Sequence, residues 1–131
     1  HCILLMNTLR HLPKSIGLYL GGMKQEELKH SESCDVIIGT YSLAHEGLDI
    51  PSLDTLLMST PKSNIVQAVG RILRETPGKQ NIPKVIDIVD HWGPFYAQYK
   101  KRCHYYKHVG CYDPHESTNP IPNSSYMFLE D

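Results

Sequence analysis

Two segments of this chain combine residue types that suit phosphate chemistry, and the first is residues 67–74, QAVGRILR. On a helix, the spacings of Gln67, Arg71 and Arg74 place these three side chains on one face. A guanidinium offers a fixed fork of donors to phosphate oxygens and keeps its charge. Such a face suits a polyanion. When these residues are taken alone, however, we favour a solvated helix face with a Glu75 salt bridge.

The second segment is residues 39–51, GTYSLAHEGLDIP, which follows a predicted strand. Gly39, the hydroxyl of Thr40 and the amides at a helix start suit a phosphate group, although an ordinary helix cap explains Thr40 equally well. For Gly47 and Asp49, the alternative is a strand-to-helix turn that uses the backbone freedom of glycine. Both segments begin where open parallel sheets bind ligands, beyond the carboxyl ends of strands.

Short apolar runs are the elements that must position these segments. Three of the four lack the polar alternation of a half-exposed strand, which is typical of a parallel sheet covered on both faces. The predicted strands are Ile16–Leu20, Asp35–Gly39, Thr55–Ser59 and Lys84–Val89. Helices are predicted at 1–12, 24–31, 64–73 with Asn64 as N-cap, and 94–108. This alternation predicts an α/β fold, an open parallel sheet with helices on both faces.

The two ends of the chain depart from this alternation. A domain of this type opens with a strand, whereas this chain opens with a helix that Pro13 stops. We therefore expect an N-terminally truncated domain at 1–112 that lacks its first strand. The residues after it, 113–131, are rich in Pro, Asn and Ser and are predicted to form an irregular C-terminal tail.

The helix at 94–108, PFYAQYKKRCHYYKH, is dense in tyrosine and basic residues. It could form a platform on which single-stranded bases stack. We favour ordinary packing, in which the aromatic side chains contact the sheet while Lys100, Lys101 and Arg102 face water. We predict no metal site, because no standard ligand spacing is matched by Cys103, His104, His108 and Cys111.

Charge and cysteine usage restrict the class of protein. The 131 residues include 13 Lys and Arg against 14 Asp and Glu, a net charge of -1. Any nucleic-acid contact should therefore be local, without a broad cationic face. Four irregularly spaced cysteines predict a reducing, intracellular compartment and no disulfides. No apolar run approaches the ~20 residues of a membrane span, and no membrane association is expected.

Taken in order, GxxxxxxEGLDIP and QxxGRxxR resemble motifs V and VI of superfamily 2 helicases. Residues 21–23 resemble the motif IVa region, and 85–90 with the later helix resemble the end of the same lobe. The resemblance covers nearly all of 1–112. It is nearest to the phage UvsW and poxvirus transcript-release helicase group and related helicases of large DNA viruses. It implies the C-terminal, RecA-like lobe of such a helicase.

The resemblance also implies a role for each matched position. The catalytic pair, which reaches the ATP γ-phosphate across the cleft between two lobes, would be Arg71 and Arg74, with Arg74 as the arginine finger. The ATP-binding positions would be Gly47, Asp49 and Gln67. The positions that contact nucleic acid would be Gly21, Gly22, Gly39 and Thr40.

ATP and Mg²⁺ are the cofactors that the resemblance implies, with magnesium held mainly by the first lobe. The chain itself has no GxxxxGK[ST] phosphate loop, no DExx segment and no SAT-like motif. It would be the second motor lobe of an ATP-dependent DNA or RNA helicase and inactive alone. Its partners would be the first RecA-like lobe of the same polypeptide and nucleic acid, with DNA favoured over RNA.

Two alternatives remain for the function. The chain could be a lobe of a double-strand DNA translocase or branch-migration motor, or a catalytically degenerate interaction module. The intact Arg71 and Arg74 argue against degeneracy, because a decayed site has no need for two arginines on one cleft face. If the protein is viral, we expect it in the host cytoplasm or a viral factory.

Overall fold

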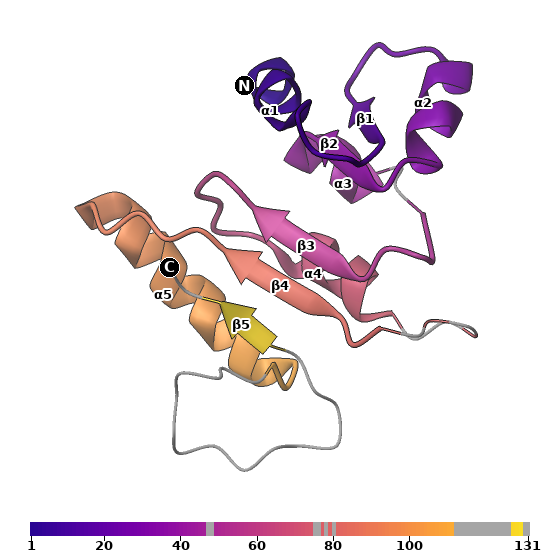
Figure 1. Cartoon of the computed structure of the whole chain (residues 1–131). Coiled ribbons are helices and arrows are strands. Elements are labelled where there is room, and N and C mark those ends of the chain that lie inside the picture. The colour runs from indigo at the N-terminus through magenta and orange to yellow at the C-terminus, as the bar shows by residue number, and fades with distance from the viewer. Residues whose placement is uncertain (47–48, 75–76, 78, 80, 112–126, 130–131) are drawn as a thin grey trace. The chain divides into compact units, whose positions relative to one another are not determined.

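The computed structural model describes residues 1–46, 49–74, 77, 79, 81–111 and 127–129. The chain divides into two compact units, His1–Ile50 and Pro51–Asp131 (Figure 1). All four predicted strands and all four predicted helices are present, with ends that differ by at most three residues. Every strand pairing is parallel. The α/β fold class with parallel strands is therefore confirmed.

The first unit is built on a two-stranded sheet. Its elements are α1 (Cys2–Leu9), β1 (Ile16–Tyr19), α2 (Gln25–Glu32), β2 (Val36–Gly39) and α3 (Tyr41–Glu46). The amide and the hydroxyl of Ser15 donate to the Asp35 carboxylate, over 2.9 and 2.7 Å, and join the starts of β1 and β2. The same hydrogen bonds hold the pKa of Asp35 below its ordinary value.

Helix α2 packs closely on β1 because the β1 residue that faces Ser31 of the helix is a glycine. A Cβ built on the buried Gly17 would lie 2.6 Å from the Cα of Ser31, which is closer than any side chain tolerates. The start of the helix is also specified locally, since the Lys24 amide donates to the Glu27 carboxylate over 2.8 Å. A short polar segment thus forms a helix through one close contact and one cap.

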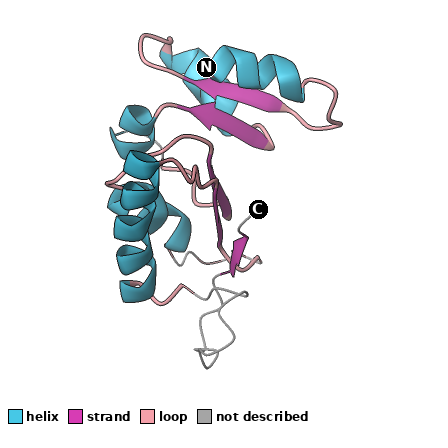
Figure 2. Ribbon diagram, turned by 90° about the vertical axis from the view of Figure 1, so that its left-hand side faces the viewer, coloured by secondary structure: helices cyan, strands magenta, loops and turns pink. Residues whose placement is uncertain are grey.

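The second unit contains a three-stranded sheet of order β3-β4-β5. Its elements are β3 (Thr55–Met58), α4 (Val66–Leu73), β4 (Lys84–Asp87), α5 (Gly93–His108) and β5 (Met127–Leu129). Figure 2 shows α4 and α5 on the same side of this sheet. The buried apolar residues described in this unit are Met58, Ile65, Val69, Ile72, Val85 and Tyr106. Of the apolar residues at helical spacing in 64–73, Ile65, Val69 and Ile72 are buried, whereas Val66 is exposed.

Two details of the predicted elements are wrong. Strand β5 lies within 113–131, the segment predicted to be irregular, and pairs with β4 in parallel. Helix α4 begins at Val66 with Ile65 as its N-cap, where Asn64 was expected. The Asn64 side chain only accepts from the Val66 amide over 3.4 Å. Ile65 is 2% exposed, so core packing sets the start of this helix and the polar cap does not.

None of the helices that the structure describes is long and apolar enough to cross a membrane. All four cysteines, Cys2, Cys34, Cys103 and Cys111, carry free thiols.

Candidate functional site

The carboxyl edge of the β1–β2 sheet brings together the four positions predicted to contact nucleic acid. Tyr19 and Gly39 are register partners at the ends of the two parallel strands. Gly21 and Gly22 follow β1, and Thr40 follows β2. These residues therefore lie beyond the same edge of the sheet. Gly22 has φ +83°, in the left-handed region that favours glycine. Glycine at position 22 therefore permits the turn that follows β1.

The groups at this edge are exposed and small. Gly21, Gly22, Gly39 and Thr40 are all exposed to solvent. The Thr40 hydroxyl oxygen lies 3.3 Å from that of Ser42 in α3. Exposed backbone and one hydroxyl can approach a phosphate without steric hindrance from long side chains. The contact itself stays a prediction.

The predicted ATP-binding positions of the first unit are described only in part. Asp49 is exposed and lies after α3, near the end of the unit. Gly47 lies outside the described residues, so its predicted role stays a prediction together with that of Asp49.

Helix α4 carries two of the three predicted residues of the segment 67–74. Gln67 is exposed and Arg71 is half-buried, one turn further along. Arg74 is the C-cap residue, with φ −57° and ψ 122°, so the backbone leaves the helix there. Arg74 keeps a helical φ and the chain turns away only after it, so the face that Arg74 is predicted to share with Gln67 and Arg71 stays a prediction. Arg74 is exposed and lies at the turn that ends α4.

Lys79 stabilises this turn, and sequence analysis missed it. Its ammonium donates to the carbonyl of Ile72 and, over 3.3 Å, to that of Arg74. Burial lowers the pKa of Lys79, and the charge of Asp54 partly opposes that shift. A cation at the last carbonyls of a helix satisfies orphan acceptors and complements the helix dipole. A basic residue shortly after the predicted helix end was the signal available in the sequence.

Replacing Lys79 by methionine should loosen the end of α4. The aliphatic chain is retained while the charge and its hydrogen bonds are lost, so the free energy of opening the last turn should fall by about 0.3–1 kcal/mol. Amide hydrogen exchange at residues 71–74 should accelerate about 2–5-fold. The control is Lys84→Met, which removes an exposed lysine at the start of β4. Unchanged exchange in Lys79→Met would mean that this ammonium does not hold the turn.

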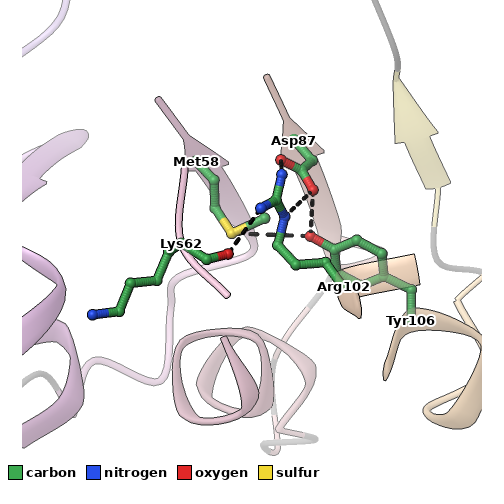
Figure 3. A network of polar contacts seen from close by, with 5 residues as sticks. All are labelled: Met58, Lys62, Asp87, Arg102 and Tyr106. Carbon is green, nitrogen blue, oxygen red and sulfur yellow. Dashed lines mark hydrogen bonds and ion pairs between the residues drawn. The ribbon is translucent and has the colours of Figure 1, made fainter. Parts of the chain in front are cut away.

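A buried ion pair lies at the end of β4 (Figure 3). Arg102 of α5 donates from Nε and Nη2 to the two carboxylate oxygens of Asp87, over 2.7 and 2.9 Å. The hydroxyl of Tyr106 donates to the same carboxylate over 2.8 Å. The exposed fraction of Arg102 is 2% and that of Asp87 is 4%. The prediction that Arg102 faces water is therefore wrong, whereas Lys100 and Lys101 are exposed as predicted.

Burial and the charge of Asp87 together shift the pKa values of Tyr106 and Arg102. Burial by itself lowers the pKa of Arg102, but the hydrogen bonds and charge of Asp87 outweigh it and raise that pKa. Burial, reinforced by Asp87, raises the pKa of the Tyr106 hydroxyl far above its ordinary value. The ion pair and the phenol donor therefore persist over the whole range of physiological pH.

Helix α5 also anchors the residues that precede and begin α4. The Nη1 of Arg102 donates to the carbonyl of Lys62 over 2.8 Å, and Figure 3 shows the ammonium end of Lys62 directed away from the ion pair. The hydroxyl of Tyr105 donates to the carbonyl of Val66 over 3.2 Å. The start of α4, and with it the position of Gln67, is thus held by α5.

The residues described fit the phosphates of ATP better than a metal ion. The guanidiniums of Arg71 and Arg74 have the donor geometry for phosphate oxygens. No three His, Cys, Asp or Glu side chains among the described residues lie close enough to hold a metal. We therefore derive no step that passes through magnesium.

Comparison with known proteins gives relatives of viral origin. The chain is 42% identical over 104 residues to a protein of Acanthamoeba polyphaga mimivirus named "Putative ATP-dependent RNA helicase". It is 29% identical over 96 residues to proteins of African swine fever virus isolates that carry the same name. These matches cover 79% and 72% of this chain. No family model and no solved structure matches significantly.

The chain spans about a fifth of the length of these curated relatives, 20% and 19%. A match of 104 residues in a chain of 131 necessarily includes both segments, 39–51 and 67–74. The predicted resemblance to viral helicases is therefore confirmed: over most of its length, this chain is a relative of viral proteins that are named as ATP-dependent RNA helicases.

Proposed function

We propose that the chain is the second motor lobe of an ATP-dependent helicase, which completes an ATP site with a first lobe and holds one nucleic-acid strand. The observation that carries the proposal is that residues 21–22 and 39–40 meet at one edge of the β1–β2 sheet, because Tyr19 and Gly39 are register partners. Ligands of open parallel sheets bind at such edges. The names of the viral relatives support the ATP dependence.

In this proposal, the second unit supplies the cationic groups for ATP. Arg71 and Arg74 would donate charge-assisted hydrogen bonds to phosphate oxygens, and Arg74 would stabilise the charge that develops in the transition state. The exposed Gln67 would contact the nucleotide beside them, and the roles of Gly47 and Asp49 stay those that the sequence resemblance implies. ATP itself supplies the reactive phosphoanhydride.

The chain alone should not hydrolyse ATP, because its described residues offer no site for magnesium and its sequence has no phosphate loop. The measurement is phosphate release by the purified chain with Mg-ATP and an oligonucleotide. A buffer blank and a mock purification serve as controls. Sustained hydrolysis above both controls would contradict the assignment as half of an ATP site. Absence of ATP turnover when the chain is joined to the proposed first lobe would favour the degenerate module.

The nucleic acid held at residues 21–22 and 39–40 is proposed to be single-stranded. The relatives are named RNA helicases, whereas the sequence resemblance favours DNA. Competition between oligo(dT) and oligo(U) of equal length decides between them, and duplex competition tests the double-strand translocase. Binding should weaken steeply with salt, because phosphate contacts release counterions.

A further inference from the structure

Helix α5 is divided by burial into two different halves. Its C-terminal half packs inward, with Arg102 and Tyr106 buried. At its N-terminal end, Trp92 is 68% exposed and Tyr96 is 38% exposed. His91 is exposed as well. The packing expected for all the aromatic residues of this helix therefore applies to only one half.

The rings at this end of α5 form two groups, one of His91, Tyr96 and the half-buried Tyr99 and one of Trp92 and the half-buried Phe95. The ring centroids of His91 and Tyr96 are 5.7 Å apart, and those of Tyr96 and Tyr99 are 5.9 Å apart. Trp92 rests on Phe95, with 5.7 Å between the centroids. We call His91, Trp92, Tyr96, Tyr99 and Lys100 the α5 strip. Mutual contact orders the rings before any ligand binds, which lowers the entropy cost of stacking on them.

Cationic groups accompany these rings. The ammonium of Lys100 lies 5.2 Å from the centroid of the Tyr96 ring, and Lys101 beside it is exposed. Helix α5 contains no Asp or Glu, although the whole chain has a net charge of -1. The nearby Asp90 accepts from the Trp92 amide over 3.0 Å. The α5 strip is thus a local concentration of rings and positive charge in a chain that is otherwise near neutrality.

The position of the α5 strip also suits a ligand. Strand β4 ends at Asp87 and α5 begins at Gly93, so the strip lies just beyond the carboxyl end of a parallel strand. Ligands of open parallel sheets bind in this region. The α5 strip belongs to the second unit, whereas residues 21–22 and 39–40 belong to the first.

We infer that the α5 strip is a second contact for single-stranded nucleic acid, in which bases stack on Trp92 and Tyr96 and a phosphate pairs with Lys100. Every base has a π face, so the strip accepts a strand without reading its sequence. Positive charge with no acidic residue on the helix matches a phosphate backbone better than an apolar protein segment. The inference rests on the proposed function, because it takes nucleic acid as the partner of this chain.

The fluorescence of Trp92 provides a direct test, because it is the only tryptophan in the chain. Titration of the 131-residue chain with dT12 or U12 at low salt should quench this fluorescence to saturation, because a base stacks on the indole. The quenching curve should coincide with the anisotropy of a labelled copy of the oligonucleotide.

Paired variants separate stacking from charge. Tyr96→Leu keeps an apolar side chain but loses the ring, and it should weaken binding at least ~5-fold, whereas Tyr96→Phe should stay within about twofold of the native chain. Lys100→Ala should reduce the slope of log K against log salt by about 0.7. Lys107→Ala, which removes an exposed lysine from the other end of α5, should leave that slope unchanged. Circular dichroism checks that each variant is folded.

The outcomes distinguish this inference from the proposed function. If the oligonucleotide binds without changing Trp92 fluorescence, and Tyr96→Leu binds it as tightly as the native chain, the α5 strip is not a nucleic-acid contact. The proposed contact at residues 21–22 and 39–40 is not affected by that result. Absence of any quenching, with self-association that Trp92→Ala abolishes, overturns this inference in favour of a protein contact. The dependence of ATP turnover on Arg74 in the proposed two-lobed helicase tests the proposed function independently of both results.

Discussion

Replacing Arg74 by alanine in the proposed two-lobed helicase should lower kcat at least ~10²-fold, because the guanidinium is proposed to act only on charge that develops in the transition state. Arg74→Lys should restore little, since an ammonium cannot reproduce the fork of donors. The measurement is steady-state ATP hydrolysis at saturating nucleic acid. Arg71→Ala should show a comparable rate defect with a higher KM for ATP.

The stability of the 131-residue chain serves as the control for Arg74. Its side chain is exposed at the end of α4, so Arg74→Ala should change the free energy of unfolding by no more than about 0.5 kcal/mol. Lys79→Met is the matched variant, because it alters the same turn without removing a guanidinium. Normal turnover together with a large loss of stability would show that Arg74 is structural. A defect in Lys79→Met as large as in Arg74→Ala would assign the effect to the turn.

Replacing Asp87 by alanine should have the largest effect on stability, a loss of about 3–5 kcal/mol, because the buried Arg102 guanidinium loses its counter-ion. In a domain of ordinary stability, such a loss approaches complete unfolding. Asp87→Asn keeps one acceptor for the Arg102 and Tyr106 donors and should therefore lose less. Urea unfolding followed by circular dichroism measures both variants.

Two further variants decide whether the loss comes from the unpaired charge. Asp90→Ala removes an exposed carboxylate three residues along the chain and should cost no more than about 1 kcal/mol. The double replacement Asp87→Leu with Arg102→Met should be more stable than Asp87→Ala, because apolar residues of similar volume can replace a buried ion pair. A double variant no more stable than Asp87→Ala would locate the energy in packing.

Local patterns determined the elements of this chain. Short apolar runs predicted all four strands to within two residues, although burial alternates along β1, β3 and β4 and does not extend to both faces as expected. Helical spacing of apolar residues predicted α4, of which Val69 and Ile72 are buried whereas Val66 is exposed. The order of the segments 39–51 and 67–74 predicted the viral helicase relatives. The signal for each element lies within about a dozen residues and the two motifs lie within 39–74, so one sequence suffices to detect them.

Contacts between distant residues decided the rest. Arg102 is buried because Asp87 lies opposite it at the end of β4, 15 residues earlier. The turn that ends α4 at Arg74 is held by Lys79, whose ammonium binds the last carbonyls of that helix. Composition alone hides β5, because its strand pairing depends on the free edge of β4. The sequence shows which residue types are present, but the partner across space determines whether a charge is buried or exposed.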